Sequence, residues 1–187
     1  MRIVAGLYRG KKLFSPQSDA VRPTADRARE SVFNILYSML EKSWSELSFA
    51  DIFAGTGAMG LEALSRGAKK VAVVDIDVAS VNKNLAMFQN EKDKVSVVKR
   101  DVCHLGVAPC AFDVVFMDAP YKKSLSEKAL CEVLDKQWLA EDGICIVETE
   151  ADENLAFDER LELVDKRKYG IANFWFLQRK KNSPQDK

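Results

Sequence analysis

The chain has 187 residues, of which 47% are hydrophobic and 30% are charged, and its formal net charge is zero. That length suits one well-buried α/β domain and is too short for two comfortable ones, and the composition is ordinary for a globular protein. No apolar run approaches the ~20 residues of a membrane helix, and Arg9, Lys11 and Lys12 interrupt the segment where a signal peptide needs its apolar core. We therefore expect a cytoplasmic protein without a membrane contact.

The charges are unevenly distributed along the chain. Residues 1–30 hold seven basic and three acidic residues, residues 31–165 hold 14 basic and 24 acidic, and residues 166–181 hold six basic and none acidic. An acidic body with basic ends indicates a localised contact with a polyanion. Lysines that only solvate the surface would give the same pattern, and for the C-terminal group the two interpretations are equally supported.

The four cysteines, Cys103, Cys110, Cys131 and Cys145, form no Cys-x-x-Cys pair. We therefore expect reduced thiols and no metal site. The single histidine, His104, has no obvious ligand or nucleophile near it in the sequence and receives no role.

The N-terminal segment has short apolar runs at residues 2–5 and 12–14, separated by a glycine-flanked basic and aromatic centre. This pattern predicts a small β-hairpin. Its exposed side chains could stack on bases and pair with phosphates; they are Tyr8, Arg9, Lys11 and Lys12.

A polar loop over residues 15–23 leads into a helix whose apolar residues recur at helical spacing to Leu40. Arg22 and Arg27 lie at its beginning, where basic residues oppose the helix dipole. This placement suggests an anionic partner for the two arginines, although Asp26 or Glu30 could also explain it.

Residues 49–60 predict a strand, a tight glycine-rich loop and the start of a helix. Gly55, Gly57 and Gly60 fit G-x-G-x-x-G, and glycines let the backbone approach a ligand closely. Alone, this match is weak, because a tight turn without a ligand can look the same and because NAD-binding folds share it. Asp51 argues against NAD, since a dinucleotide-binding strand is usually apolar at that point.

Further strands are predicted at residues 70–75, 95–98, 112–117 and 143–148, with helices near 78–89 and 124–134. Residues 160–168 and 171–178 predict an antiparallel pair, because the connection is too short for a crossover. The alternation predicts an α/β fold with a mostly parallel sheet and a final antiparallel hairpin.

Acidic residues recur where the predicted parallel strands end. Asp51 lies in the end region of the first strand, and Asp75, Asp101 and Asp118 end the second, third and fourth. Ligands of such sheets bind beyond the carboxyl ends of the strands, so the four acids predict one convergent site. A purely structural role is a poor explanation for all four, because unpaired buried carboxylates are costly.

The fourth strand ends in Asp118-Ala119-Pro120-Tyr121. The Asp118 carboxylate and the Ala119 carbonyl could accept the N–H bonds of an exocyclic amine, whose lone pair is otherwise delocalised into a nucleobase. Pro120 fixes the turn, and Tyr121 could stack on the base, which is worth ~1–3 kcal/mol. A proline turn with a surface tyrosine is the structural alternative.

Five segments form a recognisable set: Arg2-Ile3-Val4-Ala5-Gly6, Tyr8-Arg9-Gly10-Lys11-Lys12-Leu13, Arg22-Pro23-Thr24-x-Asp26-Arg27-x-Arg29-Glu30, Asp51-x-Phe53-Ala54-Gly55-Thr56-Gly57 and Leu61-Glu62-Ala63-Leu64-Ser65-Arg66-Gly67-Ala68. Together they resemble the RsmD family, the bacterial 16S ribosomal RNA guanine-N2 methyltransferases, and the resemblance covers nearly the whole chain to about Arg179. One departure is Ala119, where the family usually has proline; its carbonyl is retained, but the loop loses some rigidity.

The resemblance implies a Rossmann-like class I fold that uses S-adenosylmethionine (SAM) and no metal. It divides the chain into an RNA-contacting extension (1–45), a methyltransferase core (46–181) and a flexible tail (182–187), and we expect a monomer. The implied catalytic residues are Asp118, Ala119, Pro120 and Tyr121; the cofactor-binding residues are Asp51, Phe53, Ala54, Gly55, Gly57, Asp75, Ile76, Asp101 and Val102; the RNA-binding residues are Tyr8, Arg9, Lys11, Lys12, Arg22 and Arg27.

The implied partner is 16S ribosomal RNA or an assembling small subunit. Three alternatives remain: methylation of another exocyclic amine of a nucleic acid, a NAD-dependent oxidoreductase, and a non-catalytic RNA-binding protein on the same fold.

Overall fold

The computed structural model describes residues 1–15, 23–120 and 125–181, without the side chains of residues 23–25. Its strands are β1 (Ser48–Ile52), β2 (Lys70–Asp75), β3 (Val95–Lys99), β4 (Phe112–Asp118), β5 (Leu139–Glu150), β6 (Leu161–Tyr169) and β7 (Ala172–Arg179). Its α-helices are α1 (Pro23–Met39), α2 (Ala58–Ser65), α3 (Ala79–Leu85) and α4 (Leu125–Asp135), and short 3-10 helices cover Trp44–Glu46, Gln89–Lys94 and Val102–His104.

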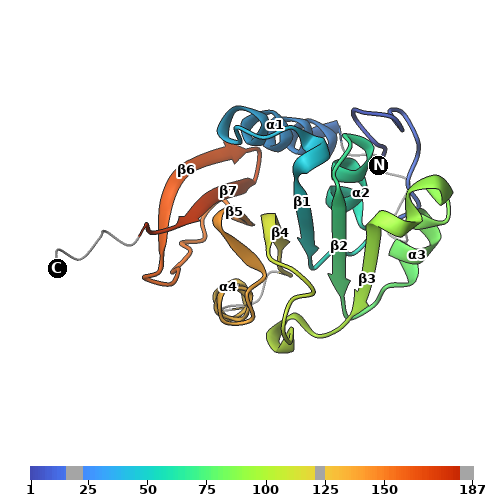
Figure 1. Ribbon diagram of the computed structural model, residues 1–187. Coiled ribbons are helices and arrows are strands. Elements are labelled where there is room, and N and C mark those ends of the chain that lie inside the picture. The colour runs from blue at the N-terminus through green and yellow to red at the C-terminus, as the bar shows by residue number, and fades with distance from the viewer. Residues whose placement is uncertain (16–22, 121–124, 182–187) are drawn as a thin grey trace.

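All seven strands form one sheet in the order β3-β2-β1-β4-β5-β7-β6 (Figure 1). The strands from β3 to β5 pair in parallel, and β7 pairs antiparallel with both β5 and β6. This confirms the predicted class I arrangement with its final hairpin. The strand order reverses between β1 and β4, and such a reversal opens a crevice at the carboxyl ends of the two strands.

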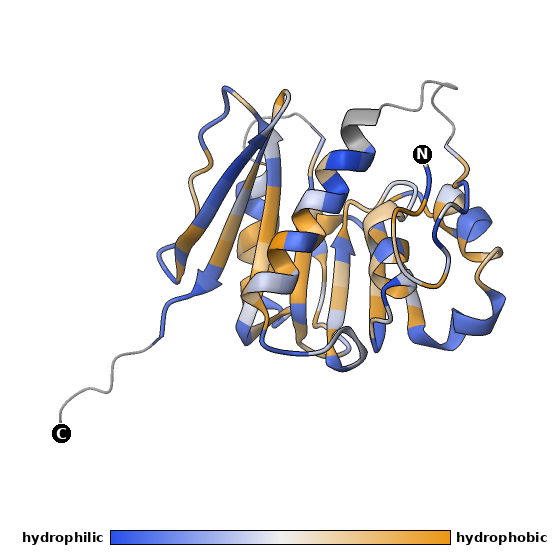
Figure 2. Cartoon of the chain, turned by 90° about the horizontal axis from the view of Figure 1, so that it is seen from above, coloured by the Kyte–Doolittle hydropathy of each residue, from blue (hydrophilic) through white to orange (hydrophobic). Residues whose placement is uncertain are grey.

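Helices cover both faces of the sheet (Figures 1 and 2). Residues of α1, α2 and α3 pack on one face around Phe49, Phe116 and Phe176. Residues of α4 pack on the other face with Trp138 and Phe112, whose rings stack at 5.5 Å. The central strands are buried on both sides, which explains why β1, β2 and β4 are almost continuously apolar instead of alternating.

Two boundaries differ from the sequence expectation by four residues. The α-helix predicted to reach residue 89 ends at Leu85, a turn follows at residues 86–87, and a 3-10 helix begins at Gln89. Strand β5 begins at Leu139, before the predicted start at Gly143, because residues 139–142 continue past a register shift opposite Phe112 and Val114. The acidic pair Glu141 and Asp142 made this stretch look like a loop.

The predicted N-terminal hairpin is reduced to one antiparallel bridge, between Arg2 and Lys12. Side chains of α2 hold the segment against the sheet: both carboxylate oxygens of the fully buried Glu62 accept amides, from Val4 at 2.7 Å and Ala5 at 3.0 Å. Gly6 has a φ of +82°, and a Cβ there would collide with the carbonyl oxygen of Ser65. The N-terminal segment is therefore built onto the core.

The expectation that Tyr8 and Lys11 are free on the surface is wrong. The Tyr8 ring packs edge-on against Phe88 with a centroid distance of 4.7 Å. The Lys11 ammonium lies 4.8 Å from the Tyr8 ring centroid and donates to the carbonyl of Met87. Arg9 and Lys12 are exposed, as expected. Within the described part of the chain, no helix is long and apolar enough to cross a membrane.

Candidate active site

The loop after β1 forms a tight turn. Gly55 and Gly57 have φ values of +54° and +75°, a conformation that favours glycine, and Phe53 adopts it as well with a φ of +62°. The Gly57 amide closes the turn on the carbonyl of Ala54 at 2.7 Å. Space is open above Gly55, where an added Cβ would meet no atom within 4 Å. A ligand can therefore approach this backbone closely.

Asp75 at the end of β2 braces the loop. One of its carboxylate oxygens accepts the Gly55 amide at 2.8 Å, and the other accepts the Asp77 amide at 3.0 Å. Asp75 is partly exposed. This hydrogen bond links the loop after β1 to the end of β2, at the carboxyl ends of the strands, where the site is predicted.

Asp51 is buried in β1 with an exposed fraction of 2%. Its carboxyl accepts the Gly60 amide at 2.8 Å, at the start of α2. Burial, with smaller contributions from Asp118 and Asp75, raises the pKa of Asp51 to about 8 although the Gly60 bond opposes the shift. Gly60 allows this approach, since a Cβ there would come within 2.8 Å of the Val73 side chain.

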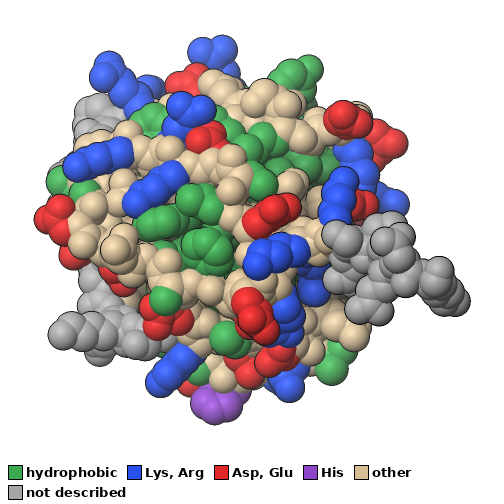
Figure 3. Space-filling model, turned by 90° about the vertical axis from the view of Figure 1, so that its left-hand side faces the viewer, with side chains coloured by type: hydrophobic (Ala, Val, Ile, Leu, Met, Phe, Trp, Pro, Cys, Tyr) green, Lys and Arg blue, Asp and Glu red, His purple; other side chains and the backbone are tan. Residues whose placement is uncertain are grey.

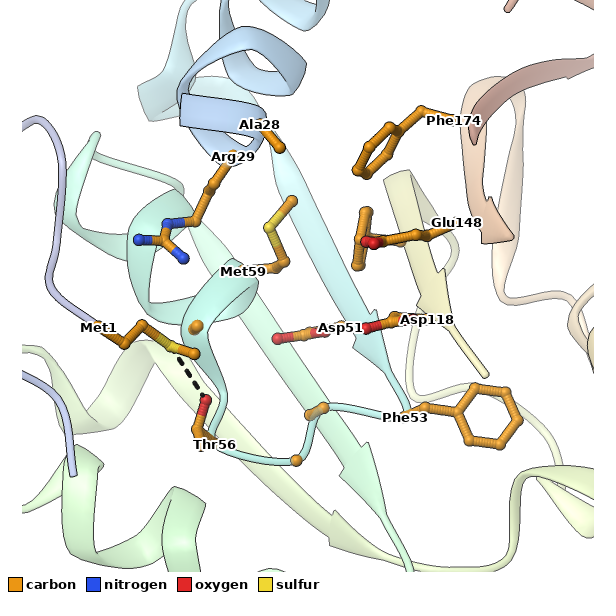
Figure 4. A pocket seen from close by; sticks show the side chains of 14 residues that line it. Met1, Ala28, Arg29, Asp51, Phe53, Thr56, Met59, Asp118, Glu148 and Phe174 are labelled. Carbon is orange, nitrogen blue, oxygen red and sulfur yellow. Dashed lines mark hydrogen bonds between the residues drawn. The ribbon is translucent and has the colours of Figure 1, made fainter. Parts of the chain in front are cut away.

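A cavity of about 270 Å³ opens at this edge of the sheet, below α1 (Figure 4). It is lined by the N-terminal residue, by α1, by the glycine loop and by the ends of β4, β5 and β7: Met1, Ala28, Arg29, Asp51, Phe53, Ala54, Gly55, Thr56, Ala58, Met59, Phe116, Asp118, Glu148 and Phe174. The Thr56 hydroxyl donates to the Met1 sulfur at 3.5 Å. Residues from six separate regions of the sequence thus meet in one cavity.

Three acidic side chains face this cavity, those of Asp51, Asp118 and Glu148 (Figure 4). Asp118 keeps part of its surface exposed at the cavity mouth, yet the surrounding protein desolvates its carboxyl and raises its pKa to about 6. Burial and the neighbouring Asp118 raise the pKa of Glu148 to about 8. Such a cluster lowers the stability of the folded protein unless a ligand donates hydrogen bonds to the carboxyl groups or carries positive charge. Carboxyl groups with perturbed pKa values are typical of functional sites.

The predicted site residues fall into three groups. Asp51, Phe53, Ala54, Gly55 and Asp118 line the cavity. Asp75, Ile76, Asp101 and Val102 lie at the neighbouring ends of β2 and β3 outside its lining, where Asp101 caps a 3-10 turn through the Cys103 amide at 2.9 Å. Ala119 is buried and Pro120 exposed beside Asp118, and Gly57 is the N-cap of α2. Tyr121 and Arg22 lie outside the described residues.

A family model described as "Conserved hypothetical protein 95" matches residues 1–178 of the chain. The "Ribosomal RNA small subunit methyltransferase D" of Haemophilus influenzae is 35% identical over 184 residues, which cover 95% of this chain and 93% of the relative. The protein of the same name from Escherichia coli K12 is 35% identical over 158 residues, 83% of this chain and 77% of the relative. The chain belongs to the RsmD methyltransferase family.

Solved structures agree with this membership. A protein from Haemophilus influenzae aligns with a TM-score of 0.79 at 31% identity, over 97% of this chain and 99% of its own. One from Escherichia coli aligns with a TM-score of 0.82 at 30% identity, over the same shares. A more distant likeness, to a ribosomal protein L11 methylase of Lactobacillus delbrueckii at 20% identity and a TM-score of 0.57, shows the shared class I fold alone.

The cavity contains residues that sequence reasoning did not single out. Glu148 and Phe174 stand on β5 and β7, and no short motif surrounds them; only their position at the strand edge could have pointed to them. Arg29 was quoted in the RsmD resemblance, but its guanidinium is bound to Asp26 at 2.7 Å and to the carbonyl of Arg2 at 2.6 Å. Arg29 therefore holds the N-terminal segment beside the cavity.

Proposed function

We propose that this RsmD-family protein transfers a methyl group from SAM to the exocyclic N2 of a guanine in small-subunit ribosomal RNA. The observation that carries the proposal is the pairing of the open glycine loop with Asp51 and Asp118 around one cavity. The names of the relatives support the ribosomal RNA substrate, and the amine-binding chemistry of Asp118-Ala119-Pro120-Tyr121 supports N2.

The site suits SAM chemically. Asp51 lies behind the glycine loop and can pair with the positively charged methionine end, while Asp75 lies where a ribose hydroxyl donor would find an acceptor. Asp101 and the adjoining Val102 amide, at the end of β3, would contact the adenine. Bound SAM supplies a methyl group activated on a sulfonium, so no further activation of that carbon is needed.

Asp118 acts on the amine. Its raised pKa of about 6 still leaves it ionised at pH 7 and above, so it can accept an N–H bond of the base. The Ala119 carbonyl accepts the second N–H, and the two acceptors orient the nitrogen lone pair toward the methyl group. Positive charge develops on nitrogen during the transfer, and a fixed carboxylate stabilises it more in the transition state than in the ground state.

The direct test is transfer of radiolabelled methyl groups to small ribosomal subunits from cells that lack this protein. We expect label in the ribosomal RNA and N2-methylguanosine after nucleoside analysis. Label in a different nucleoside would leave a methyltransferase with another target. Calorimetry with SAM and titration with NADH separate the proposal from an oxidoreductase, because only SAM should bind.

A further inference from the structure

A row of four side chains runs across the sheet from the cavity to the outer edge. Asp118 on β4 is in register with Glu148 on β5, and Glu148 is in register with Phe174 on β7. Phe174 is in turn in register with Arg167 on β6. Directly paired residues project from the same face of a sheet, so all four lie on the face that carries α1 and the cavity.

The length of this row suits one nucleotide. Neighbouring strands lie about 4.8 Å apart, which separates the backbones of Asp118 and Arg167 by roughly 14 Å. The row offers, in order, two carboxyl groups, the ring of Phe174, which is 3% exposed and lines the cavity, and a guanidinium. A nucleotide offers a hydrogen-bonding base edge, an apolar ring and a phosphate, in the same order.

Glu148 is free to bind a ligand. It is half-buried and lines the cavity, and no hydrogen bond or ion pair joins its carboxyl to any of the described residues. Burial and the neighbouring Asp118 raise the pKa of Glu148, which favours its protonated form. A carboxyl group in either form can accept a hydrogen bond from a base, and the protonated form can also donate one.

Arg167 lies at the outer end of the row, on the edge strand. Its side chain is 56% exposed, and its Nε donates to Asp165 at 2.9 Å, which leaves the terminal nitrogens of the guanidinium available. Figure 3 shows this side of the molecule, where basic side chains flank a hydrophobic patch. A guanidinium in this setting suits a phosphate of an RNA strand.

The register divides the basic C-terminal residues into two groups. Residues 166–168 lie near the β6–β7 turn, where Tyr169 pairs with Ala172. This turn is at the same end of the strands as the cavity, because Ala172 also pairs with Glu150 at the carboxyl end of β5. Arg179, Lys180 and Lys181 lie at the opposite edge, among Glu141, Asp142 and Glu159. Residues 166–168 can therefore contact RNA that enters the cavity. Arg179, Lys180 and Lys181 cannot, so substitutions among them serve as controls for loss of the same charge.

We propose that this row binds the target nucleotide, with Glu148 recognising the N1–H edge of guanine and Arg167 binding a backbone phosphate. The assignment rests on the proposed guanine-N2 function. Guanine carries its N1–H next to the N2 amine. A base whose amine is bound by Asp118 on β4 can therefore direct its N1–H and O6 toward β5, where Glu148 lies beside Asp118. Adenine could also offer Asp118 an exocyclic amine, at C6, but its neighbouring N1 is a bare acceptor and gives Glu148 no N1–H donor.

The base half is tested with synthetic RNA that carries guanine or 2-aminopurine at the position that the wild-type protein methylates. 2-Aminopurine keeps the amine but lacks N1–H and O6. We expect the wild-type single-turnover rate to be about tenfold or more higher for guanine. Glu148→Met removes the acceptor and should bring the ratio of the two rates close to one, whereas Glu148→Gln should give an intermediate ratio. An unchanged ratio in Glu148→Met overturns the proposal.

The phosphate half is tested by binding of a small-subunit ribosomal RNA transcript at several salt concentrations. Arg167→Gln should weaken binding and reduce the salt dependence by about one unit of slope, and Arg167→Lys should restore most of it. Lys180→Gln removes the same charge at the opposite edge and should change neither quantity. Equal effects of Arg167→Gln and Lys180→Gln overturn the proposal.

Failure of the N2-methyltransferase activity and failure of the binding row give different results. If the wild-type protein forms no N2-methylguanosine, the proposed function fails, and the salt dependence still tests Arg167. If the wild-type protein forms N2-methylguanosine but the preference for guanine over 2-aminopurine is the same in Glu148→Met, only the proposed role of Glu148 in base recognition is disproved.

Discussion

Asp51 is a buried carboxyl group whose charged form is disfavoured in the ligand-free protein and would be favoured by a bound cation such as the methionine end of SAM. Its pKa is about 8 in the folded protein against 3.8 for an ordinary aspartate, so between these values the folded state binds more protons than the unfolded state. The free energy of unfolding should therefore fall as the pH rises through this window, by up to about 1.4 kcal/mol per pH unit from this group. The shift of Glu148 acts in the same direction.

Asp51→Asn should flatten this dependence, because asparagine does not titrate. Urea unfolding of the ligand-free protein between pH 5 and pH 8 measures it. Asp113 is the matched contrast: burial opposes the shift, but Lys42 and Ser48 hold its pKa below the ordinary value. Asp113→Asn should therefore lower the free energy of unfolding by a nearly constant amount between pH 5 and pH 8 and leave the slope there unchanged. Parallel curves for Asp51→Asn and the wild-type protein would show that Asp51 is ionised in the fold.

Asp75 offers a second test at the level of one residue. Asp75→Ala removes the acceptor for Gly55 as well as the proposed ribose acceptor, so SAM binding should weaken by roughly 1.5–3 kcal/mol, the range of a hydrogen bond to a charged group. Calorimetry measures this loss. Asp77→Ala, two residues further on, keeps the amide that Asp75 accepts and should bind SAM almost normally. Unchanged affinity in Asp75→Ala would remove this residue from the cofactor site.

Sequence alone could indicate Asp51 and Asp118 because each stands out against an apolar strand. Glu148 could not be found in this way, since Glu148 and Glu150 alternate with Val147 and Thr149 as in any half-exposed strand. Tyr8 and Lys11 were misjudged because their partner Phe88 is distant in sequence. The local sequence pattern identifies a residue whose type is unusual for the strand or helix that contains it. The positions of other side chains depend on contacts with residues that are distant in the sequence.

At the scale of elements, α2 joins the N-terminal segment to the glycine loop. Glu62 is fully buried and accepts the amides of Val4 and Ala5, while Arg66 at 2.9 Å and Arg29 at 3.7 Å balance its charge. Glu62→Gln leaves these arginines without their anion, so we expect a loss of about 3 kcal/mol in the free energy of unfolding. Urea unfolding checks this value.

Glu91→Gln is the control, because it breaks a surface pair with Lys94 and should cost less than about 1 kcal/mol. If Glu62→Gln costs no more than Glu91→Gln, the N-terminal segment does not depend on Glu62.

Most strands were predicted to within one residue, because β1, β2 and β4 are buried apolar runs that end at turn-forming or acidic residues. The start of β5 was missed, since the exposed acidic pair Glu141 and Asp142 interrupts the apolar pattern between the buried Leu139 and Ile144. The end of α3 was missed because Phe88 continues the helical spacing although it lies outside the helix, as the buried residue that precedes the 3-10 helix Gln89–Lys94. Element ends depend on tertiary contacts that a periodic pattern does not contain.

At the scale of the whole molecule, the basic side chains should form a surface that guides RNA to the cavity. Arg9, Lys12 and Arg27 are exposed on the N-terminal segment and α1, and both of these elements border the cavity. The triple change to glutamine should reduce the salt dependence of RNA binding by up to about three units of slope and leave SAM binding almost constant. Filter binding at several salt concentrations measures the slope. Normal RNA binding by the triple variant would show a surface that is only solvated.

Single-turnover methyl transfer by Asp118→Asn tests the central claim most directly. Asparagine keeps the size and one acceptor of Asp118 but loses the charge that stabilises the positive nitrogen. At saturating SAM and with one preparation of small-subunit RNA, we expect the rate to fall at least ~10²-fold, the scale of one preorganised electrostatic group, while SAM affinity changes little. A rate within a few-fold of the wild-type value would contradict the assignment of Asp118 as the residue that orients the amine.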